Sequence, residues 1–224
     1  MIRFFEKYRW FAGIMLVVSI VIVVLFYKAL KPIPVLPIYQ PAMVSTELVD
    51  DAFQHVKKYH RIADFSLTNQ NGKTITQKEV EGHIYVADFF FTTCPTICPI
   101  MTDNMLFLQE NLSDSPEVKL LSHTVTPEID SVAQLKKYAV EKGVDDRRWN
   151  LLTGDKKQIY TLARNSYMVV KTVGDGGPYD MIHTENFVLV DPQGRIRGYY
   201  DGTQTEAMHA LLKDIEILQR EIQK

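Results

Sequence analysis

Residues 84–101 read IYVADFFFTTCPTICPIM and contain both cysteines of the chain. The segment 84–91 is a continuous apolar, β-branched and aromatic run, which predicts a buried central strand. From residue 99 to residue 112 the apolar positions recur at helical spacing, which predicts a helix. The stretch therefore indicates a strand–loop–helix unit, with Cys94 just past the strand and Cys98 at the start of the helix.

The rest of the chain alternates strand and helix signals in the same way. Asn71-Gly72 lies between two short alternating segments and predicts a two-residue hairpin turn. Strand-like runs at 118–125 and 149–154 are each followed by a helix-like run. A hairpin turning at residues 192–194 and an amphipathic helix close the chain. This order predicts an α/β fold of the thioredoxin-like type, with a central mixed sheet flanked by helices.

Residues 10–27 form a second apolar run, which contains no charged residue. As a helix this run would rise about 27 Å, close to the thickness of the hydrocarbon core of a bilayer. Trp10 and Tyr27 suit the two interfaces, and basic residues precede the run. We expect a single-pass anchor in a bacterial inner membrane, with residues 1–9 cytoplasmic and the remainder on the periplasmic, extracytoplasmic side. A cleaved signal peptide is the alternative, although the run exceeds a usual h-region and no A-x-A-like site follows it.

A proline-rich segment, residues 28–44, separates the anchor from the part of the chain that is expected to fold. Such a segment tends to the polyproline II conformation, a semi-rigid spacer of about 3.1 Å per residue. We expect one thioredoxin-like domain over residues 45–224, with no second linker. The prolines of the segment are Pro32, Pro34, Pro37 and Pro41.

The composition excludes some partners. The formal net charge is −2, and Lys and Arg form no basic stripe along the sequence, so we expect no nucleic-acid partner. Two cysteines are too few for a disulfide scaffold and too close in sequence to join distant parts of the fold. The cysteine pair therefore serves a function within one short segment of the chain.

Geometry leaves the use of the two thiols open. The start of a helix favours thiolate, which makes the sulfurs reactive or metal-binding. If residues 94–98 form roughly one helical turn, the two Cα atoms lie about 6 Å apart, a distance that suits a disulfide or a shared metal ion. A purely structural disulfide is the least favoured of these uses, because so short a loop removes little chain entropy.

Three segments resemble one family: FFFTTCPTICPIM around the cysteines, LLSHTVTPEID in the strand after them, and DMIHTENFVLVDPQGRI around His183. They are similar to the Sco/SenC family of copper-binding cytochrome oxidase assembly proteins, over nearly the whole domain. The resemblance implies that Cys94, Cys98 and His183 bind copper, as Cu(I), Cu(II) or both. It implies a copper chaperone rather than an enzyme, apart from thiol–disulfide reduction. The implied partners are the copper-receiving subunit of a respiratory oxidase and a thiol reductant or another copper chaperone.

The chemistry of these ligands agrees with the resemblance, because two thiolates and an imidazole form a soft, open site for copper. Structural zinc normally takes four protein ligands, and the chain has no further cysteine. Thr96 stands where many members of the family carry an acidic residue, which leaves the relative affinity for Cu(I) and Cu(II) open. Met101, Met105 and His123 are expected in the core, and Met181 remains a candidate auxiliary contact.

Asp88 keeps a second function open. It lies six residues before Cys94 in an apolar strand, where an ionised carboxylate is costly without a purpose. Thioredoxins carry a buried acid at the same offset, where it assists proton transfer at the second sulfur. The rival function is therefore a thiol–disulfide oxidoreductase of the cell envelope without a copper-carrier role. Asp88 is alternatively a contact behind the metal ligands or a hydrogen-bonded structural group. The loop MIHTEN (181–186) has an imidazole where such oxidoreductases place a substrate-docking proline, which favours metal binding.

Overall fold

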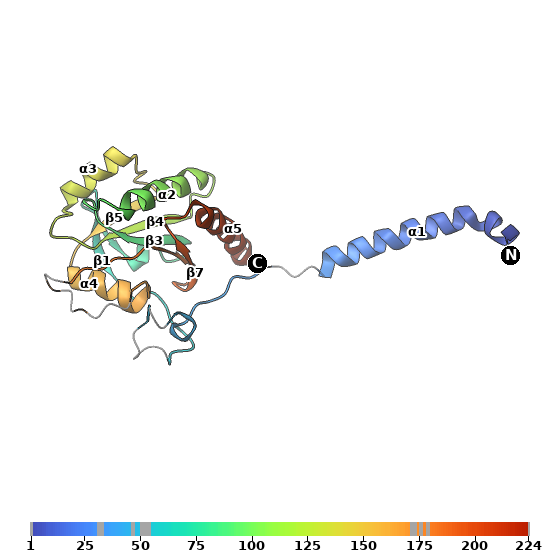
Figure 1. The fold of residues 1–224 in the computed structure, drawn as a ribbon, viewed down its shortest axis with the longest axis horizontal. Coiled ribbons are helices and arrows are strands. Elements are labelled where there is room, and N and C mark those ends of the chain that lie inside the picture. Colours follow the sequence, from blue (N-terminus) through green and yellow to red (C-terminus); the bar gives the residue numbers. More distant parts are fainter. Residues whose placement is uncertain are drawn as a thin grey trace. The chain divides into compact units, whose positions relative to one another are not determined.

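A computed structural model describes residues 2–30, 34–45, 48–49, 55–170, 174, 177 and 180–223. The chain divides into two compact units, Met1–Val35 and Leu36–Lys224, and each is described by itself (Figure 1). Part of the predicted linker, residues 31–33 with Pro32, lies outside the described residues.

Helix α1 (Ile2–Leu30) makes up most of the first unit and is drawn in blue in Figure 1. Its segment Tyr8–Tyr27 has a mean hydropathy of 2.7 and is long and apolar enough to cross a membrane. A signal sequence near the N-terminus passes the same test, so the segment is a candidate span by length and composition. The predicted anchor, residues 10–27, lies inside this segment.

The second unit is built on a seven-stranded sheet in the order β2-β1-β5-β4-β3-β6-β7. Strands β3, β4 and β5 are parallel, and the antiparallel hairpins β1–β2 and β6–β7 extend the sheet on either side. The strands are β1 (Ser66–Asn69), β2 (Thr74–Thr76), β3 (Tyr85–Phe90), β4 (Lys119–Thr124), β5 (Trp149–Thr153), β6 (Asn186–Val190) and β7 (Ile196–Asp201).

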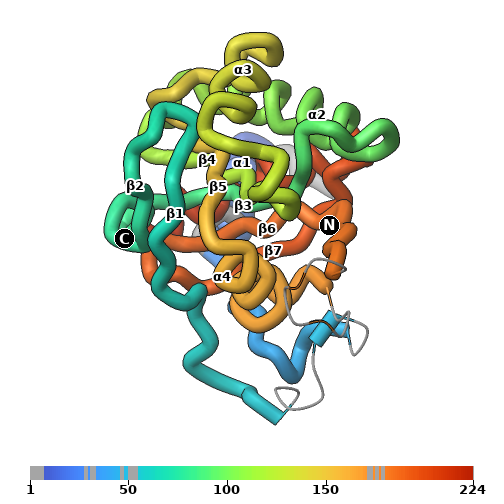
Figure 2. Tube along the Cα trace, turned by 90° about the vertical axis from the view of Figure 1, so that its left-hand side faces the viewer, coloured from blue at the N-terminus to red at the C-terminus, as the bar shows by residue number. Residues whose placement is uncertain are grey.

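Helices cover both faces of the sheet, as Figures 1 and 2 show. One face carries α2 (Ile97–Asn111), α3 (Val132–Lys142) and α5 (Thr205–Ile222), whose buried residues share one core cluster. The other face carries α4 (Lys156–Thr161) and the π-helical turn η3 (Leu162–Ser166), which contribute to a second cluster. Two short helical turns, η1 (Pro41–Met43) and η2 (Gln77–Glu79), lie in connections.

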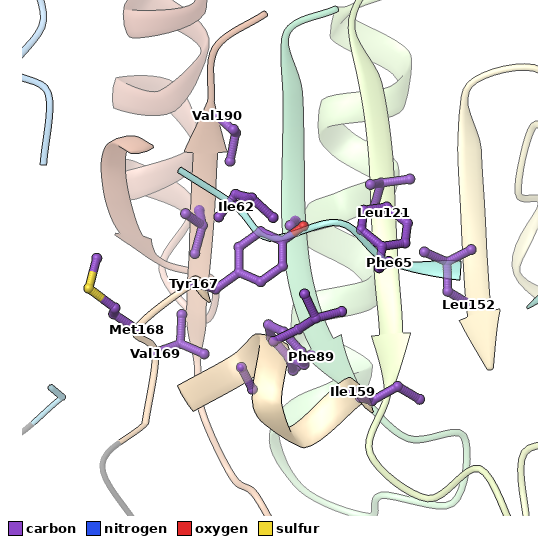
Figure 3. Close-up of a cluster of buried hydrophobic side chains, with 14 of the residues drawn as sticks. Ile62, Phe65, Phe89, Leu121, Leu152, Ile159, Tyr167, Met168, Val169 and Val190 are labelled. Atoms are coloured by element: carbon purple, nitrogen blue, oxygen red, sulfur yellow. The ribbon is translucent and has the colours of Figure 1, made fainter. Parts of the chain in front are cut away.

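All residues of β3 are buried, and they alternate between the two cores because successive side chains of a strand point to opposite faces. Tyr85, Ala87 and Phe89 belong to the cluster under α4, which Figure 3 shows around Phe89 and Tyr167. The residues between them face the cluster that holds both cysteines. The predicted buried strand is confirmed.

Both predicted hairpins form, but the first turn is longer than the sequence indicates. The N–H of Asn69 donates to the carbonyl of Lys73 at 2.9 Å, so residues 70–72 make a three-residue turn. Gly72 adopts φ +73°, the left-handed conformation that closes hairpin loops of this length. Gly194 adopts φ +74° in the same way in the turn at residues 192–194.

The second unit begins at Leu36, and its residues 36–44, here called the strap, pack against the rest of it. The N–H of Tyr39 donates to the carbonyl of Ile196 at 2.8 Å. The guanidinium of Arg197 donates to the carbonyls of Leu36 and Pro37 at 2.8 and 3.0 Å. A proline-rich segment offers carbonyl acceptors, and a buried guanidinium far along the chain satisfies them here.

Replacing Arg197 with methionine should lower the free energy of unfolding by roughly 3–5 kcal/mol. Arg197 is 3% exposed and pairs with Asp191 at 3.2 Å and Glu221 at 2.5 Å, so its removal leaves buried acceptors without a cation. Urea unfolding measures the change. The matched control is Arg220→Met, which breaks an exposed ion pair with Glu216 and should cost less than about 1 kcal/mol. Equal losses in the two variants would refute the structural role of Arg197.

Candidate dithiol and metal site

Both cysteines lie where β3 gives way to α2, as the sequence predicts. Cys98 is the second residue of α2, and Cys94 lies in the loop before it. Both are free thiols and buried, with 7% of Cys94 and 4% of Cys98 exposed. Residues 94–96 are not helical, in contrast to the single helical turn that the sequence suggests. The reason is local, because Cys94 precedes Pro95, and a residue before proline is disfavoured in the helical conformation.

The Cys94 thiol is poised to ionise near neutral pH. Burial opposes its ionisation, but hydrogen bonds from Cys98 and Thr96 outweigh burial and lower the pKa of Cys94 to about 7. The donors are the Cys98 thiol, the backbone N–H groups of both residues and the Thr96 hydroxyl, whose oxygen lies 3.6 Å from the sulfur. Thr96 therefore supplies an uncharged hydrogen-bond donor to the Cys94 sulfur.

The Cys98 thiol holds its proton. Burial raises the pKa of Cys98 to about 12, and its hydrogen bond to Cys94 and the negative charges of Cys94 and Asp88 act in the same direction. One sulfur of the pair is thus a ready nucleophile and soft ligand, while the other donates to it. A bound metal ion or a disulfide partner must displace the Cys98 proton.

A buried carboxylate that the sequence analysis did not single out fixes the loop before Cys94. Asp130 is fully buried and accepts from the N–H and the hydroxyl of Thr92 at 3.1 and 2.5 Å. It also accepts from the hydroxyls of Thr124 and Thr126, at 2.5 and 3.1 Å. The sequence does place threonines close to Asp130 at the end of β4. It gives no indication that Asp130 also contacts Thr92, which lies far away in the sequence.

His183 lies beside the cysteine loop. Its exposed ring meets the Phe91 ring edge-on, with the centroids 6.0 Å apart. Phe91 directly follows β3, and its carbonyl accepts from the N–H of Cys94 at 3.3 Å. Because β6 pairs antiparallel with β3, the segment before β6 meets the end of β3. The structure therefore brings the imidazole and the two thiols to the same end of the sheet.

The three predicted ligands are neighbours without forming a closed cluster. Within the described part of the chain, no three His, Cys, Asp or Glu side chains lie close enough to hold a metal ion. The donor set nevertheless fits a soft metal, because both thiols are free and the described residues give the His183 imidazole no hydrogen bond. Closing the set requires the imidazole and the two sulfurs to come closer together.

Asp88 and His123 are buried polar groups beside the site. Asp88 is 3% exposed, and burial raises its pKa to about 7 against a hydrogen bond from Ser122. One of its carboxylate oxygens has no partner among the described residues. His123 is fully buried, stacks on Phe89 at 4.9 Å and approaches the Asp88 carbonyl at 3.2 Å, which confirms it as a core histidine. Burial lowers the pKa of His123 to about 4, so its ring is neutral at neutral pH.

Met101 and Met105 lie in the core, as the sequence predicts, whereas the auxiliary contact of Met181 stays a prediction. Met101 and Met105 are fully buried and pack in the core cluster that includes both cysteines. Met181 is 38% exposed, and the Tyr160 hydroxyl points at its sulfur from 4.0 Å. The same hydroxyl donates to the carbonyls of Val125 and Asp180, which ties the segment before His183 to the end of β4.

A mixed sheet covered by helices, with a dithiol at the junction of β3 and α2, defines a thioredoxin-like domain. A family model described as SCO1/SenC matches residues 54–218. A SCO1 protein homolog of Bacillus subtilis is 32% identical over 159 residues, which cover 70% of this chain and 82% of that protein. The chain belongs to the SCO1/SenC family.

Solved structures of relatives share the fold. BsSco, described as a member of the Sco family of cytochrome c oxidase assembly proteins with a disulfide switch, is 31% identical with a TM-score of 0.61. The match covers 71% of this chain and 93% of BsSco. Arabidopsis thaliana ScoI with copper bound is 26% identical with a TM-score of 0.56, over 69% of this chain and 97% of ScoI. The predicted thioredoxin-like fold is confirmed.

Limiting iodoacetamide should modify Cys94 before Cys98, with a rate that rises with pH around a midpoint of about 7. Thr96→Val removes one donor to the thiolate and should raise this midpoint by about half a unit to one unit. Peptide mass spectrometry of the quenched protein measures both values. Thr161→Val, an exposed site on α4, is the control and should leave the midpoint unchanged. Equal modification of the two cysteines, or a midpoint near 9 in the parent protein, would contradict the hydrogen-bonding pattern.

Asp88→Asn should stabilise the reduced protein at neutral pH. The folded pKa of about 7 lies above the ordinary value of 3.8, so ionisation of Asp88 destabilises the folded state as pH rises between these values. The advantage of the variant should grow from about pH 4 to about pH 7, reach a few kcal/mol and stay level above that. Urea unfolding at several pH values under reducing conditions measures it. Asp64→Asn, at an exposed carboxylate, serves as the control, and an equal pH-dependent gain there would sink the explanation.

Proposed function

We propose that this chain is a membrane-anchored copper chaperone that delivers copper to a respiratory oxidase, or reduces the copper-site cysteines of that enzyme. Cys94, Cys98 and His183 are the proposed ligands. The candidate span in α1 is the proposed single-pass anchor in a bacterial inner membrane, with the domain on the periplasmic side. A thiol reductant or another copper chaperone is the proposed upstream partner.

The observation that carries this proposal is the convergence of a reactive thiol pair and an accessible imidazole at one end of the sheet. Cys94 ionises near pH 7, and its loop contacts Phe91, against which the His183 ring lies. Two sulfurs and one imidazole hold Cu(I) well and leave the ion accessible to an acceptor. Membership of the SCO1/SenC family supports the same ligands.

The redox state of the thiols would control the cargo. Oxidation of Cys94 and Cys98 to a disulfide releases two protons and two electrons and removes both thiolate ligands, so a bound copper ion must leave. A disulfide in the client, reduced through attack by the Cys94 thiolate, takes up the same two electrons. Copper delivery and client reduction therefore draw on one pair of sulfurs.

A thiol–disulfide oxidoreductase without copper transport is the second candidate, because two features favour it. The split between a low pKa at Cys94 and a high pKa at Cys98 is typical of an attacking thiol and its resolving partner. Asp88 raises the pKa of Cys98 through its charge, so it lies close enough to influence the second sulfur.

Titration of the reduced full-length protein in detergent with Cu(I), in competition with a chromophoric chelator, tests the ligand set. We expect one equivalent to bind, and His183→Ala should weaken binding at least tenfold because a direct ligand is lost. His83→Ala is the control, since His83 lies before the opposite end of β3 and contacts the Glu117 carbonyl. Unchanged affinity in the His183 variant would exclude the three-ligand site.

A reductase assay separates the two candidate functions. Rapid copper-free reduction of a disulfide substrate, with an added dithiol as the electron donor, would favour the oxidoreductase if Cys94→Ser abolishes it and His183→Ala leaves it unaffected. Cu(I) binding that requires His183, together with slow copper-free turnover, would favour the chaperone.

A further inference from the structure

A basic groove lies on the domain away from the dithiol. It is a cavity of about 470 Å³ whose lining includes Lys57, Lys58, Tyr59, Arg61 and Arg195, and none of the described residues that line it carries a carboxylate. Ile38 and Met43 of the strap complete its rim. The sequence shows only the Lys57-Lys58 pair, because Arg195 reaches the groove from the β6–β7 turn.

The walls of the basic groove are held by hydrogen bonds. The N–H of Ala42 in the strap donates to the carbonyl of Val56 at 3.1 Å, and the N–H of His60 donates to the Gln40 side chain at 3.0 Å. The N–H of Ile62 donates to the carbonyl of Gly194 at 2.8 Å. The strap, the segment before β1 and the β6–β7 turn therefore form one connected surface.

Most of the positive charge in the groove has no opposite charge paired with it among the described residues. Arg195 pairs with the buried Asp191 at 2.7 Å, whereas Lys57, Lys58 and Arg61 are exposed and form no ion pair with any described residue. Like charges held together in this way attract an anionic partner from solution.

Tyr59, which also lines the basic groove, is unusually exposed and has an unusual backbone conformation. It is 92% exposed and has φ +67°, a left-handed conformation that is rare for an aromatic residue. Strained conformations of this kind tend to occur where function requires them. An exposed tyrosine with cations on both sides suits an interface between water and lipid, where the ring is buried and the hydroxyl stays hydrated.

The short segment between the candidate span and the domain, here called the tether, indicates which anionic partner the groove can reach. The segment from Tyr27, the end of the candidate span, to Leu36 reaches at most about 30 Å when extended at ~3.3 Å per residue. The strap that follows lines the groove, so the groove lies within a few residues of the point where the tether joins the domain. We propose that the basic groove docks the domain on anionic phospholipid headgroups of the membrane that holds α1. The inference uses only the anchor from the proposed function and is independent of copper.

Docking would orient the dithiol. The end of β6 pairs with the start of β3, since Val190 lies opposite Tyr85, so the β6–β7 turn lies at the end of the sheet opposite Cys94. A domain that contacts the bilayer through Arg195 and the strap presents the cysteine loop to the aqueous side. There it can meet the extramembrane part of another protein.

Hydrogen exchange of the full-length chain in nanodiscs tests the proposal. One set of discs contains phosphatidylcholine alone, and the other an equal mixture of phosphatidylcholine and phosphatidylglycerol. In the anionic discs, amides of residues 38–43 and 55–61 should exchange about tenfold more slowly, and high salt should abolish the difference. The triple variant Lys57→Glu, Lys58→Glu, Arg61→Glu should lose the protection.

A matched variant controls for net charge. Lys73→Glu, Lys157→Glu and Lys213→Glu change the formal charge equally at exposed sites outside the groove, and protection should persist. Loss of protection in both variants, equal protection on neutral discs, or no protection on anionic discs overturns the proposal, and the last result would leave an acidic protein as the occupant. A chain that fails to enter discs of either composition refutes the anchor as well. Cu(I) binding, measured separately, is unaffected by any of these outcomes.

Discussion

The complete burial of β3 is the constraint on which the rest of the domain depends. A strand that is buried on both faces needs helices on both, and the alternation of its residues between two cores fixes which face each one meets. The last residue of β3 then sets where the cysteine loop begins. Asp130 holds that loop through Thr92, so the loop is joined to β4 as well as to β3. The positions of both sulfurs follow from the position of this one strand.

The buried polar groups near the end of the sheet that carries the cysteines differ in how well their hydrogen bonds are satisfied. Asp130 has hydroxyl and amide donors around it, which is the usual condition for a buried carboxylate. Asp88 keeps one oxygen without a described partner and therefore destabilises the fold when it ionises. His123 is kept neutral by the same burial. Asp130 is thus a structural acid, whereas the charge of Asp88 also raises the pKa of the Cys98 thiol.

Local patterns predicted the elements well, because hydrophobic period and turn residues depend on neighbours in the sequence. Residues 84–91 and 99–112 contain most of β3 and α2, and His183, which the resemblance implies as a ligand, lies beside the cysteine loop. Contacts across the chain were not predictable in this way. The strap depends on Arg197, and the cysteine loop depends on Asp130, partners that no periodicity reveals. The non-helical conformation of Cys94 does follow from a neighbour in the sequence, because a residue before proline is disfavoured in the helical conformation.

The location of the cysteines inside a packed core links chemistry to folding. Cys94 and Cys98 belong to the same cluster as Met101, Leu108 and residues of α5, so forming or breaking a bond between the sulfurs changes the packing of the domain interior. Oxidation and unfolding form a closed thermodynamic cycle. Any difference in unfolding free energy between the dithiol and disulfide forms must therefore equal the difference in their reduction free energy between the folded and unfolded chain. Comparing the unfolding of the two forms therefore measures how far folding shifts the reduction potential of the cysteine pair.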